Sequence, residues 1–463
     1  MGFKGKFAGV TAAAIMAMTQ GAWAESLADA MASAYKNSGL LQQNQAVLRA
    51  ADEDVAIALS ALRPVIQYSL SHGWKDTDGA GPAPSGRANS AELSASLLLY
   101  DFGRSQMGVE AQKQIVLATR EALVGVEQNV LLRAVQAFLN VRSAIENATL
   151  QANSVRVLTQ ELRAAQDRFE VGEVTQTDVA NAQARLASAR ADEVAAQGQL
   201  AIAREEYRAA IGHLPKSMPG TPHFPKTAKS LSEAQSIARA RHPNIRAAQY
   251  QVAAADLGIE RARVAMKPTL RVGASTTLTD RIDDGVGANF NNEIGLSLSG
   301  DLYAGGRHSA TYRKAIAQAE QARLALQLAR LAVDQEVANA WSQMAIATAS
   351  LEATDRQIRA GRVALRGTRE EATLGSRTTL DVLNAEQALR NAEAARISAQ
   401  SSRYLAAYSL LASMGLLTAE HLNLGVVSYD AEAYYNAVRN APVRKISPQG
   451  ERLDAIISIL GRQ

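Results

Sequence analysis

The segment 171–182, VGEVTQTDVANA, recurs 203 residues later as 374–385, LGSRTTLDVLNA. Other segments repeat at almost the same offset: AAD at 50–52 returns at 254–256, and LYDFGR at 99–104 returns as LYAGGR at 302–307. Matches in one order along the chain indicate a tandem duplication of about 200 residues. We expect a first repeat at 25–214, a proline-rich linker at 215–230, a second repeat at 231–424 and a C-terminal tail at 425–463.

The duplicated segment lies after a long helical tract in each repeat. Residues 104–169 and 307–374 contain no proline, and apolar or small residues recur there with alternating spacings of three and four. This spacing predicts two packed, supercoiled helices, each roughly 100 Å long. A glycine turn and a shorter helix follow each tract, at 178–211 and 381–415. Further helices are expected at 27–62 and 244–266, ahead of each long tract.

Two regions between these helices have strictly alternating apolar and polar residues. Apolar and polar residues alternate around 64–100 and around 268–302, with a polar loop in the middle of each region. A period of two predicts two β-hairpins, four strands in all, each long enough to cross a bilayer when tilted. The alternation alone fits a membrane barrel and a half-buried soluble hairpin equally well.

An export signal favours the membrane interpretation. Lys4 and Lys6 precede an apolar stretch, and AWA at 22–24 fits a cleavage site, so residues 1–24 are predicted to be a signal peptide. Four strands cannot close a barrel, and an open edge in lipid leaves backbone groups unpaired. The chain is therefore predicted to associate. Two copies give eight strands and three copies give twelve; the polar faces of the helices favour a water-filled tube and three copies.

The composition argues against an enzyme and against a metal-binding protein. The chain has no cysteine, its six histidines are scattered, and its sequence has no nucleotide-binding or nucleophile motif. We expect no enzymatic activity, no cofactor and no metal site. A net charge of +4 without a basic cluster gives no support for nucleic-acid binding. A trimeric structural or adhesive coiled coil is the alternative from another class, but it does not account for the repeated hairpins.

The duplication, the paired hairpins, LYDFGR and LYAGGR, and the two glycine turns resemble the TolC family of outer-membrane efflux proteins. The resemblance implies an α+β membrane protein: a homotrimer with a twelve-stranded barrel in outer-membrane lipid, continuous with a long periplasmic α-helical barrel. It also implies an exit duct that works with a periplasmic adaptor (membrane fusion) protein and an inner-membrane transporter, either an ABC or a proton-driven one. The lack of a lipidated cysteine favours type I protein secretion over multidrug or small-molecule efflux.

The resemblance also assigns roles at the helical tip. Adaptor hairpins are implied to dock at the two turns, Val171-Gly172 and Leu374-Gly375. For the gate, the resemblance implies that Arg377 bonds towards Thr177 or Asp178, and that Asp381 forms a ring of carboxylates.

Two positions depart from the family pattern. Asn384 stands where a second aspartate ring is expected, and Ala372 stands where a tyrosine normally partners the Asp178 position. These departures predict a weaker or different latch. Independently of any gate, an acid at Asp178 or Asp381 is also placed to cap a helix N-terminus.

Overall fold

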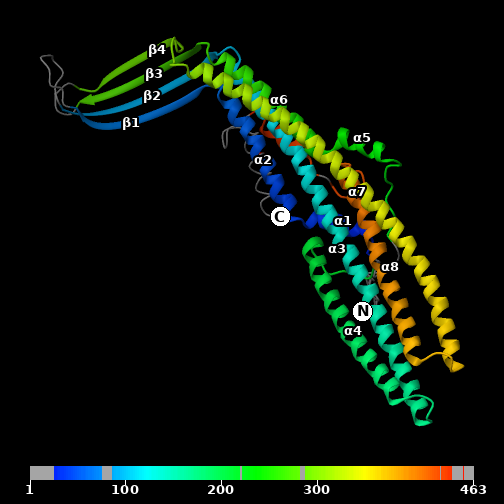
Figure 1. The fold of residues 1–463 in the computed structure, drawn as a ribbon. Helices are drawn as coiled ribbons and strands as arrows, with labels where there is room; N and C mark the ends of the chain where they lie inside the picture. The colour runs from blue at the N-terminus through cyan, green and yellow to red at the C-terminus, as the bar shows by residue number, and fades with distance from the viewer. Residues whose placement is uncertain are drawn as a thin grey trace, which may run out of the picture.

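The computed structural model describes residues 25–75, 86–218, 222–281, 287–427, 429–440 and 452. The molecule is elongated, with a sheet at one end and helices running from the sheet to a narrow tip (Figure 1). The predicted signal peptide at 1–24 lies outside the described residues, as does most of the predicted C-terminal tail after residue 440. None of the helices in these ranges is long and apolar enough to cross a membrane.

The sheet contains two strands from each repeat. Strands β1 (Val65–Lys75) and β2 (Gly86–Tyr100) form one hairpin, and β3 (Thr269–Arg281) and β4 (Asn289–Ser299) form the other. The strand order is β1-β2-β3-β4 and every pairing is antiparallel. The β2–β3 pairing therefore joins the two repeats, and the prediction of four strands per chain is confirmed.

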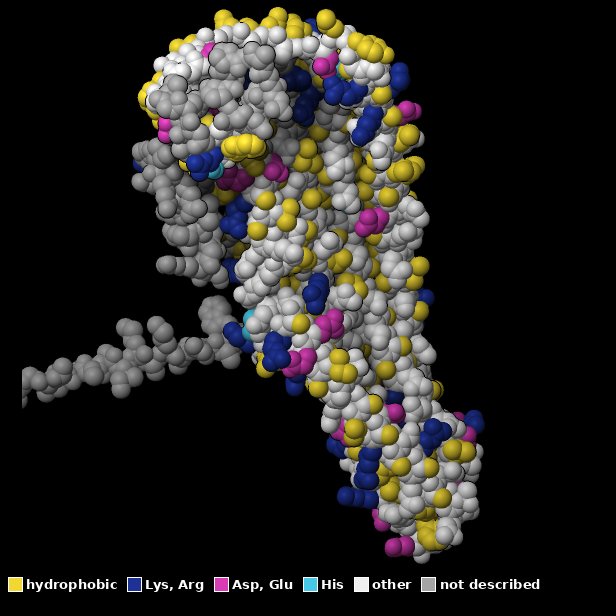
Figure 2. Space-filling model, turned by 90° about the vertical axis from the view of Figure 1, so that its left-hand side faces the viewer, with side chains coloured by type: hydrophobic (Ala, Val, Ile, Leu, Met, Phe, Trp, Pro, Cys, Tyr) yellow, Lys and Arg dark blue, Asp and Glu magenta, His cyan; other side chains and the backbone are white. Residues whose placement is uncertain are grey.

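The register aligns the alternating residues of all four strands. Ile66 pairs with Ala95, Ala95 with Ala274, and Ala274 with Ile294, so one apolar row crosses the whole sheet. Neighbouring strand positions point to opposite faces, which makes the other face polar. This face carries Gln67, Ser71, Ser94, Ser96, Ser275, Glu293 and Ser297. In Figure 2 the sheet forms the arch at the top, and hydrophobic side chains gather along its outer rim.

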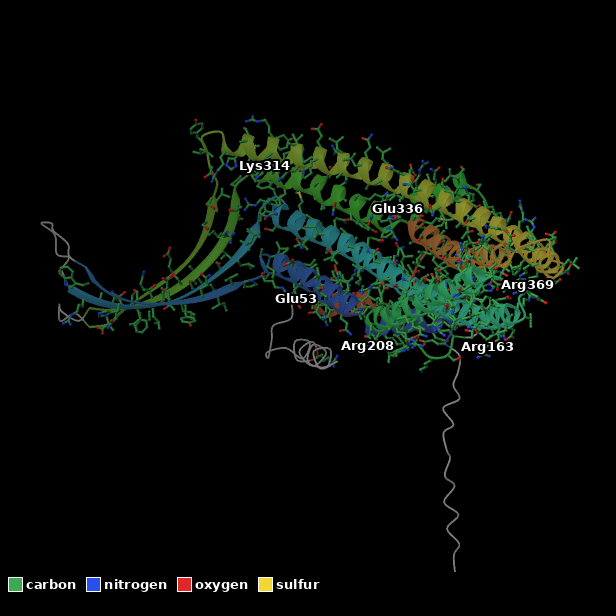
Figure 3. All side chains as sticks on the ribbon, turned by 60° about the horizontal axis from the view of Figure 1, so that its bottom comes forward. Glu53, Arg163, Arg208, Lys314, Glu336 and Arg369 are labelled. Carbon is green, nitrogen blue, oxygen red and sulfur yellow. The ribbon has the colours of Figure 1, made fainter. Side chains whose placement is uncertain are left out.

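Two long helices form the body of the molecule. Helix α3 spans Arg104–Glu170 and α7 spans Arg307–Thr373, 67 residues each. Each turns at the tip into a shorter antiparallel helix, α4 (Gln176–Ile211) or α8 (Thr379–Ser413). Part of the predicted three-and-four spacing is buried: Leu131, Val141 and Val337 have no exposed surface. Figure 3 shows Lys314 near the sheet end of α7 and Arg369 near its tip.

The helix predicted at 27–62 is interrupted. It consists of α1 (Leu27–Asn37) and α2 (Gly39–Ser60), because the Ser38 hydroxyl accepts a hydrogen bond from the Leu41 amide and starts a new helix. The second repeat has the same break. There, α5 (Leu231–Arg241) is followed by α6 (Pro243–Val264), which begins with a proline at its first position.

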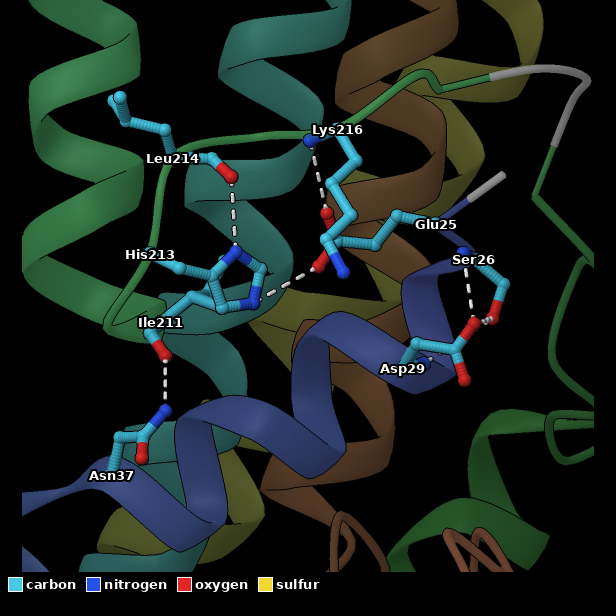
Figure 4. Close-up of polar contacts among 8 residues, drawn as sticks. All are labelled: Glu25, Ser26, Asp29, Asn37, Ile211, His213, Leu214 and Lys216. Carbon is cyan, nitrogen blue, oxygen red and sulfur yellow. Dashed lines mark hydrogen bonds and ion pairs between the residues drawn. The ribbon is translucent and has the colours of Figure 1, made fainter. Parts of the chain in front are cut away.

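The first repeat is tied to the linker through Glu25. Its carboxylate accepts hydrogen bonds from the Lys216 amide at 3.2 Å and lies 3.3 Å from Nε2 of His213 (Figure 4). Nearby, Nδ2 of Asn37 donates to the Ile211 carbonyl at 2.9 Å, which joins α1 to the end of α4. The start of the first repeat and its last helix are thereby fixed together.

A short C-terminal helix, α9 (Ala431–Val438), packs against α2. The Tyr434 hydroxyl donates to Oε1 of Glu53 at 2.9 Å. On α3, the Arg120 guanidinium lies 5.3 Å from the centre of the Tyr435 ring. These contacts fix the described part of the tail against the side of the helical body.

Candidate gate and docking site at the helical tip

The two tip turns have the same backbone conformation. Gly172 has φ = +81° and Gly375 has φ = +78°, the left-handed region that glycine adopts without strain. The Gly172 amide donates to the Phe169 carbonyl at 3.0 Å, and the Gly375 amide donates to the Ala372 carbonyl at 3.2 Å. The duplicated sequence therefore folds into a duplicated turn.

A capping box follows each turn. The Asp178 carboxylate accepts hydrogen bonds from the Thr175 amide at 3.0 Å and the Thr175 hydroxyl at 2.7 Å, while the Asp178 amide donates to that hydroxyl. Thr378 and Asp381 repeat the arrangement at 3.0 and 2.9 Å. The hydrogen bonds from Thr378 lower the pKa of Asp381, so this carboxylate stays ionised. Both aspartates thus cap helices.

A groove of about 580 Å³ lies between the two turns. Asp178 lines it from the first turn, and Gly375 and Arg377 line it from the second. Thr177 is exposed on the first turn of α4, and Asp381 is half-buried on the first turn of α8. The fold therefore brings the predicted gate residues of the two repeats to the same end of the molecule.

The predicted bond from Arg377 to Thr177 or Asp178 is not made within the single chain. Instead, Nε of Arg377 donates to Oε2 of Glu371 at 3.0 Å, within its own turn. One carboxylate oxygen of Asp178 is already occupied by both donors of Thr175. No tyrosine stands at Ala372, and within the single chain Glu371 takes the arginine. A bond from Arg377 to Thr177 or Asp178 of a neighbouring copy stays a prediction.

Other arginines connect the two repeats at the tip, and the sequence pattern does not predict them. Arg369 on α7 bonds to Glu161 on α3 and Glu386 on α8, each at 2.9 Å. Arg185 on α4 donates to Oδ1 of Asn384 on α8 at 2.9 Å. The two pairs that join the repeats, Arg369–Glu161 and Arg185–Asn384, are about 200 residues apart in sequence, and the repeat pattern contains no signal for them.

Apolar side chains project from the outermost part of the tip. Val171 is 71% exposed and Leu374 is 84% exposed, and each directly precedes a turn glycine. Both residues stand at equivalent positions of the duplicated turn.

Comparisons with known proteins agree with this architecture. The family model described as outer membrane efflux protein matches residues 30–213 and 234–416. The chain is 35% identical to the outer membrane efflux protein BepC of Brucella suis biovar 1, over 93% of this chain and 94% of BepC. It is 26% identical to the alkaline protease secretion protein AprF of Pseudomonas aeruginosa, over 73% of each chain.

The fold also matches solved structures. A crystal structure of CusC superimposes with a TM-score of 0.75 at 21% identity, over 85% of this chain and 92% of that one. The two family matches coincide with the two halves of the duplication, and each contains one hairpin and one long helix. The chain therefore belongs to the outer membrane efflux protein family, whose members are channels and not enzymes.

Proposed function

We propose that three copies of this outer-membrane channel protein form the exit duct of a tripartite export system. The observation that carries the proposal is the sheet, with one continuous apolar face and two unpaired outer edges, at β1 and β4. Pairing β4 of one copy with β1 of the next satisfies both edges, and three copies supply twelve strands. The apolar face would then contact lipid and the polar face would line the lumen.

The helical body supports the same head-to-tail assembly. Helix α7 lies at one margin of the body, and α2 and α4 lie at the other (Figure 1). Leu324, Leu328 and Leu331 are more than half exposed on α7 and follow helical spacing, so they share one face. Val47 and Ile57 on α2, with Val194 and Ile202 on α4, are similarly exposed at the opposite margin. Contact between the two margins of neighbouring copies would cover both sets.

The tip would form the periplasmic entrance of the duct. In a trimer, three copies of Asp381 would surround the axis, together with Thr177, Asp178, Arg377 and Asn384 from each chain. Within each chain, Arg369 and Arg185 hold the two tip hairpins together. Opening the entrance would require the hairpins to separate, and these bonds would oppose that motion.

We place adaptor docking at the two turns, Val171-Gly172 and Leu374-Gly375. A periplasmic adaptor would join the duct there to an inner-membrane transporter. The double variant Val171→Ser, Leu374→Ser should still assemble but lose adaptor binding in a pull-down from detergent. The matched control is Val427→Ser, which alters an exposed valine of the C-terminal tail, away from the tip and from both proposed contact margins. Unchanged adaptor binding by the double variant would place docking elsewhere.

Small-molecule efflux is the use that the comparisons support best, because BepC, which is named for efflux, is 35% identical along almost the whole chain. Protein secretion, which the sequence analysis placed first, is the second candidate, and the similarity to AprF favours it. If the protein serves small-molecule efflux, deleting its gene should make cells retain more of a fluorescent efflux dye. Loss of a secreted protein from the medium with dye retention unchanged would instead support the second.

A further inference from the structure

A second polar groove lies further from the tip than the one between the turns. It has a volume of about 480 Å³, and its lining comes from α3, α4 and α8. It shares no lining residue with the tip groove. Apart from three charged residues and some alanines, the lining consists of amide and hydroxyl side chains, including Ser154, Gln387 and Asn391.

Arg390 is the unusual member of this lining. It is only 9% exposed, and burial lowers its pKa. One terminal nitrogen donates to the Ser154 hydroxyl and the other to Oε1 of Gln387, while Nε has no hydrogen-bond partner. Within the described part of the chain, no carboxylate lies within ion-pair distance of it. A buried cation without a counter-ion carries a large desolvation cost.

The nearest candidate counter-ion is already engaged. Glu386 precedes Arg390 by one helical turn, but its Oε2 accepts from Arg369 at 2.9 Å. Arg185 lines the groove from α4 and makes its hydrogen bond to a neutral amide, that of Asn384. Asp192 is the only acid in the lining. Two guanidinium groups against one carboxylate leave the groove with an excess positive charge.

We propose that this groove binds a small organic oxyanion, a solute that carries carboxylate or phosphate groups. Guanidinium groups match the geometry of such oxygens and can hold them with paired hydrogen bonds. The volume falls within the range of small-molecule sites. An anion bound between Arg185 of α4 and Arg390 of α8 would link the two tip hairpins. The Arg185–Asn384 hydrogen bond already joins the same two helices.

The test is isothermal titration calorimetry of the full chain, purified in detergent. Citrate and inorganic phosphate are titrated separately, and chloride salt keeps the ionic strength constant. We expect saturable binding of citrate at one site per chain. Arg390→Gln should weaken it at least tenfold, Arg185→Gln should also weaken it, and Asp192→Asn should tighten it. Arg356→Gln is the matched control, because Arg356 is exposed on α7 and is paired with Glu352.

The proposal is overturned if neither anion binds saturably, or if Arg390→Gln and Arg356→Gln bind citrate equally well. If Arg390→Gln does not assemble, the citrate affinities of Arg185→Gln and Asp192→Asn decide instead. Wild-type citrate affinity in both variants also overturns the proposal. The titration needs no transport, so its failure and the failure of the export function are separate results.

Discussion

The guanidinium of Arg369 lies 2.9 Å from Oε1 of Glu161 and 2.9 Å from Oε2 of Glu386. One side chain on α7 thereby holds α3 of the first repeat and α8 of the second. The Glu386 side chain is only 11% exposed, which shelters this pair from water and strengthens it. Arg377, in contrast, pairs with Glu371 within its own turn, and both side chains are more than half exposed.

Arg369→Ala should therefore open the entrance more than Arg377→Ala does. Loss of the Arg369–Glu161 bond removes roughly 1 kcal/mol of attachment between the hairpins, because this pair is only partly sheltered from water. It also leaves Glu386 without its partner inside the second hairpin. The expected result in planar-bilayer recordings is a higher mean conductance for Arg369→Ala and a small change for Arg377→Ala. Arg356→Ala on the same helix is the control. A large increase for Arg377→Ala alone would show that a bond between chains supplies the latch.

Asp381→Asn should lower the cation preference of the closed pore without opening it. In the proposed trimer, three ionised carboxylates near the axis would raise the local concentration of cations, and the Thr378 hydrogen bonds lower the pKa of Asp381. An asparagine can still accept the capping hydrogen bond, so the helix start is preserved. Reversal potentials in a salt gradient measure the effect. Identical selectivity in wild type and variant would remove Asp381 from the constriction.

The repeat pattern was sufficient to predict the secondary structure of the tip, because short-range rules decide it. A glycine turn followed by Thr-x-x-Asp specifies a left-handed residue and a capping box, and both occur twice. Four alternating segments likewise predicted the strands. The pairing of Arg185 with Asn384 and of Arg369 with Glu161 could not be predicted, because such contacts depend on how separate helices approach in space. The break at Ser38 was missed although the sequence carries a signal for it, because Asn37, Ser38 and Gly39 are poor helix formers and serine is a common N-cap.

The folded protein should become more stable as the pH falls below about 6, because of the buried acid Asp52 on α2. Asp52 is fully buried, and among the described residues neither of its carboxylate oxygens has a hydrogen-bond partner. Burial raises its pKa from 3.8 to about 6, against the attraction of Arg120 and with a further contribution from Glu53. A raised folded-state pKa means that the folded state prefers the protonated acid. Above pH 6 the ionised Asp52 therefore lowers the free energy of unfolding by about 3 kcal/mol. This loss is recovered as the pH falls from about 6 to about 4, where the acid becomes protonated in the folded protein.

Asp52→Asn should abolish most of this pH dependence. The measurement is the thermal stability of the detergent-purified protein at pH 5 and pH 7.5. Wild type should gain more stability at pH 5 than the variant does. Asp54→Asn, which changes an exposed neighbour on α2, should behave like wild type. Equal pH dependence in wild type and Asp52→Asn would contradict the assignment.

Single cysteines should report the two faces of the sheet. Ser297 lies on the polar face and Leu296, 70% exposed in the single chain, lies on the apolar face. Because the natural chain has no cysteine, labelling is free of background. In cells, Ser297→Cys should react with a small water-soluble maleimide, and Leu296→Cys should react far less, since lipid covers it. Equal labelling would indicate a sheet outside the membrane.

The mass of the assembled protein in detergent tests the central claim most directly. The account requires neighbouring copies to pair β4 with β1 and to cover the exposed apolar margins of α7, α2 and α4. Light scattering with the detergent contribution subtracted should give three chains per particle, and boiling in SDS should reduce the particle to single chains. A stable, folded single chain in mild detergent would contradict the account, because both edges of its sheet would remain unpaired.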